Sequence, residues 1–169
     1  MPIKTKRWND PKEPDDGYRL LICRYRPRGV RKADESWDAW CSELGPSRKL
    51  HGDFYGKNGP PIGWSEYCRR YLEEMNEQHE IIAELAGLLA EGATITLLCS
   101  SACTDASHCH RTLLRNLIER QIEQRGNSAA TGKTCQEDHV VPKRVELIEG
   151  DAGKPRRGRR KKSSPHSPA

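Results

Sequence analysis

The sequence predicts an α/β fold, in which a small, mostly parallel sheet is flanked by helices. Two apolar runs have the length and composition of buried strands, at Tyr18–Arg24 and at Ala93–Cys99. About 70 residues, mostly with helical spacing of their apolar positions, separate these two strands. Parallel strands need a long crossover connection, and a helix is its usual form, so this spacing favours a parallel sheet.

The N-terminal part of the chain predicts a short edge strand before the first buried one. Residues Ile3–Trp8 alternate apolar and polar side chains, and the Pro- and Asp-rich stretch Asn9–Gly17 predicts a turn. The strand at Tyr18–Arg24 then ends at Arg26–Gly29. The proline of that segment has no N–H for a sheet ladder, and its glycine permits an unusual backbone angle.

The middle of the chain predicts one short helix and one long loop. A helix over Lys32–Leu44 would place Trp37, Trp40 and Leu44 on one face, and Gly45–Ser47 would end it. The segment His51–Gly63 contains four glycines and two prolines, and we expect a loop there.

Helical spacing recurs in three later segments. Their apolar positions are Trp64, Tyr67, Tyr71, Leu72 and Met75; Ile81, Ile82, Leu85, Leu88 and Leu89; and Leu113, Leu114, Leu117, Ile118 and Ile122. Gly92 is a C-terminal stop for the second helix, and the third helix covers His110–Gln124. A last strand is expected over Val140–Ile148, where a proline confines it to an edge.

Composition limits the size of the folded core. Only 34% of the residues are hydrophobic and 31% are charged, so we expect one domain over residues 1–148 and a disordered basic tail over residues 149–169. No apolar run reaches the roughly 18 residues that span a bilayer. The N-terminus lacks the apolar segment of a secretory signal, and the sequence predicts a soluble, cytoplasmic protein without membrane contact.

The basic character of the chain is concentrated in its last residues. The formal net charge is +5, but residues 154–169 hold seven basic residues and no acidic one. The remaining 22 basic residues against 24 acidic ones give the rest of the chain a charge of −2. Such a tail either contacts DNA or RNA through the phosphate backbone or is a solubilising extension.

The candidate functional site lies between the second buried strand and the helix that follows it. Ligands of open α/β sheets bind at such strand ends, where helix N–H groups favour an anion. The first buried strand ends nearby, so the basic side chains of both loops are expected to converge on a phosphate. These side chains are Arg24, Arg26, Arg28, His110 and Arg111. Pairing of the same arginines with neighbouring carboxylates is an equally weighted alternative.

A second hypothesis concerns catalysis by a cysteine. His108, Cys109 and Arg115 match the H-C-x5-R spacing of cysteine phosphatases, in which a thiolate attacks phosphate and an arginine holds it. The residues between Cys109 and Arg115 contain no glycine and favour a helix over a phosphate loop.

A third hypothesis is a zinc site. Seven cysteines, an odd number, in a chain without an export signal argue against a disulfide framework, and reduced thiols can bind metal. Cys99, Cys103 and His108 are the candidate ligands, although their spacing matches no familiar zinc knuckle. An interaction protein supported by zinc is the function that such a site would indicate.

Several segments resemble the YeaO-like family of small bacterial proteins, within the domain of unknown function 488. The similarity lies in Asp15–Leu21, Arg24–Val30, Trp40, Leu44, Pro46-Ser47, Leu50, Trp64–Tyr71, Thr94–Leu98 and the Cys-His-Arg at 109–111. It covers roughly residues 2–125. The family usually has an acidic residue where this chain has Cys23. The resemblance implies a compact α/β fold and a candidate site, but not an activity.

The sequence thus favours a protein that binds a phosphate-bearing small molecule, a nucleotide or nucleic acid at the strand ends. No residue pair identifies a nucleophile together with its base, so an enzyme and a binding module both remain open.

Overall fold

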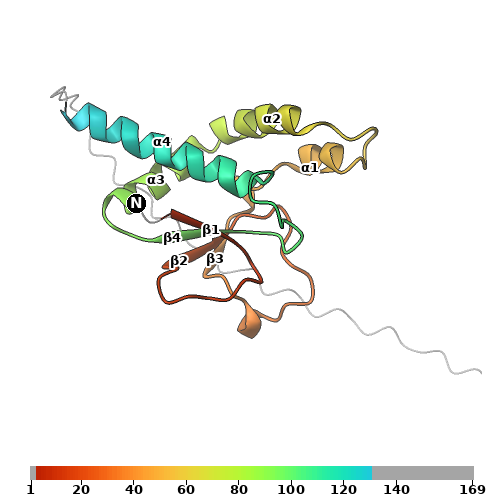
Figure 1. Ribbon diagram of the computed structural model, residues 1–169, viewed down its shortest axis with the longest axis horizontal. Helices are drawn as coiled ribbons and strands as arrows, with labels where there is room; N and C mark the ends of the chain where they lie inside the picture. Colours follow the sequence, from red (N-terminus) through yellow and green to blue (C-terminus); the bar gives the residue numbers. More distant parts are fainter. Residues whose placement is uncertain (1–2, 131–169) are drawn as a thin grey trace, which may run out of the picture. The chain divides into compact units, whose positions relative to one another are not determined.

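The computed structural model describes residues 3–130 and shows one parallel sheet with four α-helices (Figure 1). The strands are β1 (Ile3–Arg7), β2 (Tyr18–Leu21), β3 (Ala39–Trp40) and β4 (Ile95–Cys99), in the spatial order β1-β4-β2-β3. The helices are α1 (Arg48–Phe54), α2 (Trp64–Asn76), α3 (His79–Ala90) and α4 (His110–Ala130). The predicted α/β class with a parallel sheet is therefore confirmed.

The central strand β4 determines the architecture of the sheet. It pairs in parallel with β1, where Ile3 lies opposite Ile95, and with β2, where Tyr18 lies opposite the same residue. All five residues of β4 are buried, as expected of an apolar strand covered on both faces. Because the strands are parallel, β1, β2 and β4 end at the same edge of the sheet.

The four helices cover one face of the sheet (Figure 1). Alternate strand residues point to this face, including Leu20, Ile22 and Leu97, which belong to one buried cluster with side chains from every helix. Leu114 and Ile118 of α4 are completely buried in it. The helical periodicity predicted for α2, α3 and the start of α4 places most of its apolar residues in this cluster, as expected. Leu72 and Leu88 are the exceptions, and Leu88 is 44% exposed.

The opposite face of the sheet is covered by loops rather than by helices. A second buried cluster, which we call the loop-covered cluster, lies there. It is formed by Leu21, Cys23, Trp37, Leu98, Cys99 and Cys109, with Trp8, Val30 and Cys103 packed against it. The loop between β1 and β2 reaches β2 through Gly17, whose positive φ of 61° and close approach to the backbone oxygen of Thr94 leave no room for a Cβ atom.

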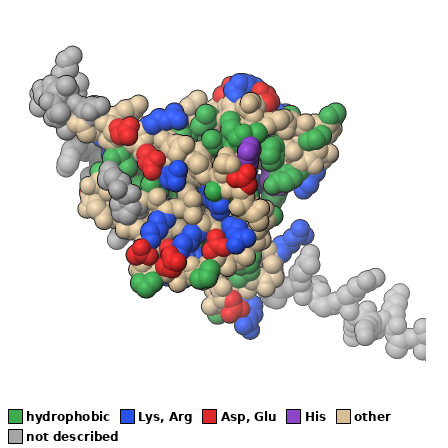
Figure 2. Space-filling model, in the orientation of Figure 1, with side chains coloured by type: hydrophobic (Ala, Val, Ile, Leu, Met, Phe, Trp, Pro, Cys, Tyr) green, Lys and Arg blue, Asp and Glu red, His purple; other side chains and the backbone are tan. Residues whose placement is uncertain are grey.

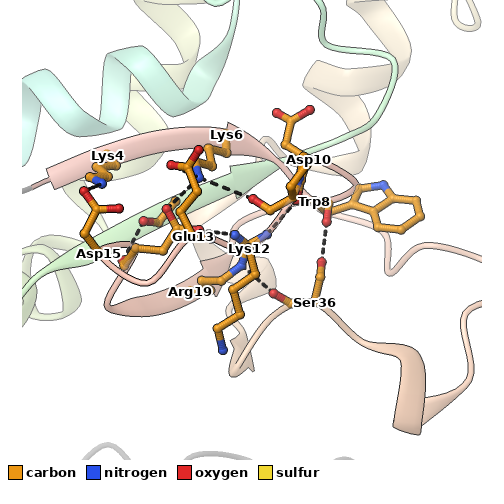
Figure 3. A network of polar contacts seen from close by, with 12 residues as sticks. Lys4, Lys6, Trp8, Asp10, Lys12, Glu13, Asp15, Arg19 and Ser36 are labelled. Carbon is orange, nitrogen blue, oxygen red and sulfur yellow. Dashed lines mark hydrogen bonds and ion pairs between the residues drawn. The ribbon is translucent and has the colours of Figure 1, made fainter.

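A buried ion pair secures these loops. Arg19 and Asp16 are both completely buried and form a salt bridge, and Lys6 reaches Asp16 at 2.7 Å. The Arg19 Nε atom donates to the backbone oxygen of Ser36, which joins the loop before β3 to the same network (Figure 3). Burial by itself would raise the pKa of Asp16, but hydrogen bonds from Lys6, the Glu13 backbone and Arg19 outweigh it and lower the pKa to about 2.

The face of the protein drawn in Figure 2 carries interspersed charges of both signs. The exposed ion pairs of the described residues include Lys4–Asp15 and Arg69–Glu66. Exposed pairs of this kind contribute little to stability, about 0–1 kcal/mol each.

Two local predictions are wrong. The expected helix over Lys32–Leu44 is instead a 3-10 turn at Lys32–Asp34, the short strand β3 and a second 3-10 turn at Ser42–Leu44. Tertiary contacts outweigh the helical spacing there, because β3 pairs with the edge of β2 and Trp37 turns into the loop-covered cluster. Within the expected loop His51–Gly63, residues 51–54 belong to α1, which starts after the N-cap Ser47.

Some predictions lie outside the described residues. These are the strand over Val140–Ile148, the domain boundary at residue 148 and the basic tail at 149–169. Among the helices of residues 3–130, none has the length and apolar character needed to cross a membrane.

Candidate functional site

A cavity of about 300 Å³ opens at the sheet edge where β1, β2 and β4 end. Its walls come from the strand ends, from α1 and the start of α2, and from the loop between β4 and α4. The residues that line it are Trp8, Cys23, Arg24, Tyr25, Pro27, Arg28, Pro46, His51, Phe54, Tyr55, Trp64, Tyr67, Cys99, Ser100, Ser101, Cys103, His108, Cys109 and His110. The predicted position at the carboxyl ends of parallel strands agrees with this location.

The cavity wall is aromatic on the helix side. Tyr25, His51 and Tyr55 are in ring contact, with centroids 5.4 Å apart for Tyr25–His51 and 4.8 Å for His51–Tyr55. Trp64 stacks on Tyr67 at 5.1 Å. Figure 2 shows hydrophobic side chains gathered around histidine over the region of α1 and α2. Sequence analysis missed this wall because it assigned His51 and Tyr55 to a loop.

The predicted arginines do not all converge. Arg24 and Arg28 line the cavity, whereas Arg26 and Arg111 do not. Arg26 forms an ion pair with Glu35, as the alternative of carboxylate pairing anticipated. The Arg24 Nε and Nη2 atoms donate to the backbone oxygens of Pro46, at 2.7 Å, and Gly45, at 3.2 Å, so its side chain is held in place.

Arg111 is buried in an unusual way. It is 5% exposed, and its Nε and Nη1 atoms have no hydrogen-bond partner among the residues described. Its charge helps to lower the pKa of Asp10 and of Cys103, so it lies within electrostatic range of both. A buried guanidinium without bonded acceptors needs a nearby negative charge.

Three thiols form the cavity floor. The sulfur atoms of Cys99, Cys103 and Cys109 lie within 4.8 Å of one another, and Cys99 Sγ is 3.3 Å from Cys103 Sγ. Hydrogen bonds from Cys109 and Cys99, with a smaller contribution from the charge of Arg111, lower the pKa of Cys103. The pKa values of Cys99 and Cys109 are raised in turn, since their thiols are the donors. We call Cys99, Cys103 and Cys109 the three-thiol cluster.

His110 faces this cluster from the first position of α4. Its Nε2 atom lies 3.0 Å from the backbone oxygen of Ile22, and a carbonyl only accepts hydrogen bonds, so Nε2 carries the proton. The lone pair of the neutral ring is then on Nδ1, which lies 3.8 Å from Cys99 Sγ. Burial lowers the pKa of His110, which favours this neutral form.

His108 is turned away from the three-thiol cluster. Its Nδ1 atom lies 2.8 Å from an oxygen of Asp105, and its ring contacts Trp64 at 5.2 Å. Asp105 also accepts hydrogen bonds from Ser107, and this turn shapes the loop that leads into α4. Among the described residues, the group of thiols suited to a metal includes Cys109 in place of the predicted His108.

Cys109 and Arg115 have the spacing but not the surroundings of a phosphatase loop. Residues from His110 onward are helical, and Arg115 lies in α4 with its Nε atom 3.8 Å from Glu119. Arg115 does not line the cavity. The helical conformation that the glycine-free spacing favoured is thus present, and no phosphate-binding loop forms between these two residues.

Comparisons with known proteins give one consistent result. The family model DUF488-N3a, described as the active DUF488-N3 subclade, matches residues 3–122. The uncharacterized protein YeaO of Escherichia coli K12 is 36% identical over 108 residues, which are 64% of this chain and 90% of that protein. The uncharacterized protein Rv3073c of Mycobacterium tuberculosis is 28% identical over 116 residues, 69% of this chain and 92% of its own. No solved structure matches the chain.

Proposed function

Since this chain belongs to the YeaO-like branch of the DUF488 family, we propose that its cavity binds a small phosphate-bearing ligand with an aromatic ring, of the nucleotide class. The observation that carries the proposal is the charge of the cavity lining. Among the described residues that form it are two arginines, Arg24 and Arg28, and there is no aspartate or glutamate. Arginine side chains in a cleft raise the local concentration of anionic ligands.

Arg28 is the cation best suited to bind the phosphate. It lines the cavity, and within the described part of the chain it has no carboxylate partner. A guanidinium group presents parallel N–H donors that match two phosphate oxygens. Arg24 adds a second positive charge whose position is already secured by the Gly45 and Pro46 carbonyl groups.

The aromatic wall suits the remainder of such a ligand. Tyr25 and Tyr55 are 50% and 56% exposed and both contact His51 at the cavity, so their rings are accessible to a ligand. Planar bases stack on such rings at about 1–3 kcal/mol per base. A volume of about 300 Å³ is at the lower end of small-molecule sites and fits a single nucleotide rather than a folded macromolecule.

Two tryptophans in the wall, Trp8 and Trp64, make the proposal measurable by intrinsic fluorescence. The full chain is titrated with AMP, with inorganic phosphate and with adenosine. We expect AMP to bind most tightly, because only AMP engages both the arginines and the aromatic rings. Absence of saturable AMP binding, or equal affinity for adenosine and AMP, would refute the proposal.

A matched pair of variants tests the role of Arg28. Arg28→Gln should weaken AMP and phosphate binding by about 10–100-fold, the equivalent of one charged hydrogen bond. Arg31→Gln is the control, because Arg31 is 83% exposed, pairs with Asp34 and lies outside the cavity. Tyr55→Ala should weaken AMP binding but leave phosphate binding unchanged. Equal losses in the two arginine variants would contradict the assignment of Arg28.

A further inference from the structure

The floor of the cavity carries chemistry that phosphate binding does not use. The three-thiol cluster collects sulfur atoms from the end of β4, from the following loop and from the residue before α4. Two of its members are buried, with Cys99 at 1% and Cys109 at 2% exposure. Three thiols in mutual contact, two of them buried, place three donor atoms for a thiolate-preferring metal at one point.

We propose that Cys99, Cys103, Cys109 and His110 form a Cys3His site for a divalent thiolate-preferring ion of the zinc class. This ligand set keeps Cys99 and Cys103 of the set predicted from the sequence, and it has Cys109 and His110 in place of His108. This inference does not depend on the proposed phosphate binding, because none of the four ligands is an arginine or an aromatic residue of the wall.

The distances between the three sulfur atoms fit tetrahedral coordination. Zinc–sulfur bonds of about 2.3 Å place two thiolates roughly 3.8 Å apart in a tetrahedron. The three sulfur atoms already lie within 4.8 Å of one another, with Cys99 and Cys103 at 3.3 Å. His110 Nδ1 lies 3.8 Å from Cys99 Sγ, close to the separation of roughly 3.6 Å expected for a nitrogen and a sulfur on one zinc ion.

The surroundings of His110 fit a metal ligand as well. A histidine that binds metal through one nitrogen almost always donates its other N–H to a carbonyl or a carboxylate. In this protein the Nε2 proton is held by the backbone oxygen of Ile22, directly after β2, which leaves the lone pair on Nδ1. Cys99 Sγ lies 3.8 Å from Nδ1 and 3.9 Å from Nε2. The ring is therefore fixed in the tautomer that coordination requires.

Charge balance selects a divalent ion. Three thiolates carry three negative charges, a divalent ion leaves one, and the buried guanidinium of Arg111 compensates that one. Arg111 is available for this role because its Nε and Nη1 atoms have no hydrogen-bond partner in the described residues and the nearby Asp10 is paired with Arg7. With a monovalent ion, one negative charge of the thiolates would remain uncompensated, and an unpaired charge in a buried site is costly. On binding, each thiol loses its proton to solvent and no electron is transferred.

The test uses the full chain, kept reduced and stripped of metal by a chelator, with free thiols counted before each measurement. Co²⁺ is added as a spectroscopic probe, since tetrahedral thiolate coordination gives intense visible bands, and Zn²⁺ is then used to displace it. We expect one equivalent of Co²⁺ per chain, with sulfur-to-cobalt charge-transfer absorption, and complete displacement by Zn²⁺. A reduced protein that binds no Co²⁺ or Zn²⁺ stoichiometrically would overturn the proposal.

Variants separate the site from general stability. Cys103→Ser replaces the half-buried thiol of the three-thiol cluster. It should weaken Co²⁺ binding by more than roughly 10–100-fold, which is the loss expected when only a hydrogen-bond partner of a metal ligand is removed. Cys41→Ser and Cys68→Ser are controls, because both thiols lie outside the cluster. Circular dichroism establishes that each variant is folded. Unchanged Co²⁺ affinity in folded Cys103→Ser would overturn the site.

The fourth ligand has its own test. Cys23 also contacts Cys99 and offers a sulfur atom in place of the His110 nitrogen. His110→Gln should weaken Co²⁺ binding and shift its visible bands, whereas Cys23→Ser should leave both unchanged. The reverse pattern would overturn the assignment of His110. Loss of phosphate binding with retained metal binding would refute only the proposed function, so the two proposals fail separately.

Discussion

The Asp16→Asn variant tests how the loop-covered face of the sheet is held together. Asp16 is completely buried and contacts Arg19, which is also completely buried, and Lys6. The substitution keeps the size of the side chain and removes its charge. It leaves the Arg19 guanidinium in the interior without its counter-charge, and breaking one partner of a buried pair typically costs about 3–5 kcal/mol.

The lowered pKa of Asp16 gives a second value for the contribution of the buried ion pair to the stability of the fold. A carboxyl group with a pKa of about 2 in the folded protein and 3.8 as its ordinary value is stabilised when charged. The difference corresponds to about 2.5 kcal/mol of folding free energy. Because the folded pKa is the lower one, this stability is fully present above pH 4 and is lost as the pH falls through about 2.

Urea denaturation measures both effects. At pH 7 we expect Asp16→Asn to lower the free energy of unfolding by about 3 kcal/mol. The variant should also lose less stability than the wild type when the pH falls from 4 to 2. Asp15→Asn is the control, since its carboxylate is 74% exposed, pairs with Lys4 and should cost less than about 1 kcal/mol. A loss below about 1 kcal/mol in Asp16→Asn, or the same acid dependence as the wild type, would show that the buried pair does not secure these loops.

Two further substitutions test local structure by the same denaturation assay. Gly17→Ala should lower the free energy of unfolding by at least about 2 kcal/mol, because a Cβ atom would lie 2.2 Å from the backbone oxygen of Thr94. Gly29→Ala is the control: Gly29 also has a positive φ but open space around it, and its replacement should cost only about 1 kcal/mol. Equal losses of stability in the two variants would contradict the close approach at Gly17. Ser47→Ala removes the side chain that accepts from the Leu50 N–H at the start of α1 and should cost about 1 kcal/mol, against less than about 0.5 kcal/mol for Ser65→Ala on the exposed side of α2. Indistinguishable serine variants would mean that α1 does not depend on its N-cap.

Much of the fold could be predicted because its signals are local. The apolar run at β4 and the 3.6-residue periodicity of α2 and α3 identify those elements from neighbouring residues alone. The segment with Trp37 and Trp40 could not be predicted in this way. Its apolar spacing suits a helix, but Trp37 packs under a loop and Trp40 donates through Nε1 to the Cys23 carbonyl. Both contacts depend on chain segments far away in sequence.

The α1 helix was missed for a different reason. Its N-cap, Ser47, follows Gly45-Pro46 and was interpreted as the end of a preceding helix rather than as the start of a new one. Glycines within and after the helix then favoured a loop. The same error removed His51 from the predicted site. Tyr55, which follows α1, was also absent from that site, although both residues line the cavity.

The location of the candidate site followed from topology, but the roles of its residues did not. Parallel strands ending at one edge predicted that the basic side chains of both loops converge. Arg24, Arg28 and His110 do line the cavity, whereas Arg26 and Arg111 do not. Non-local packing determines that Arg26 pairs with Glu35 and that Arg111 is buried. Sequence spacing likewise grouped His108 with the thiols, whereas its carboxylate partner Asp105 holds it on the outer side of the loop.

The cavity floor and the protein interior share the same atoms. Cys99 and Cys109 line the cavity and also pack with Leu21, Trp37 and Leu98 in the loop-covered cluster, while Tyr25 and Tyr55 at the cavity wall are largely exposed. A substitution on the floor therefore alters packing together with chemistry, whereas one at the exposed wall alters only chemistry. Wall residues should therefore tolerate substitution better than floor residues. New ligand preferences should arise by replacement of wall residues, while the floor residues stay the same because the fold requires them.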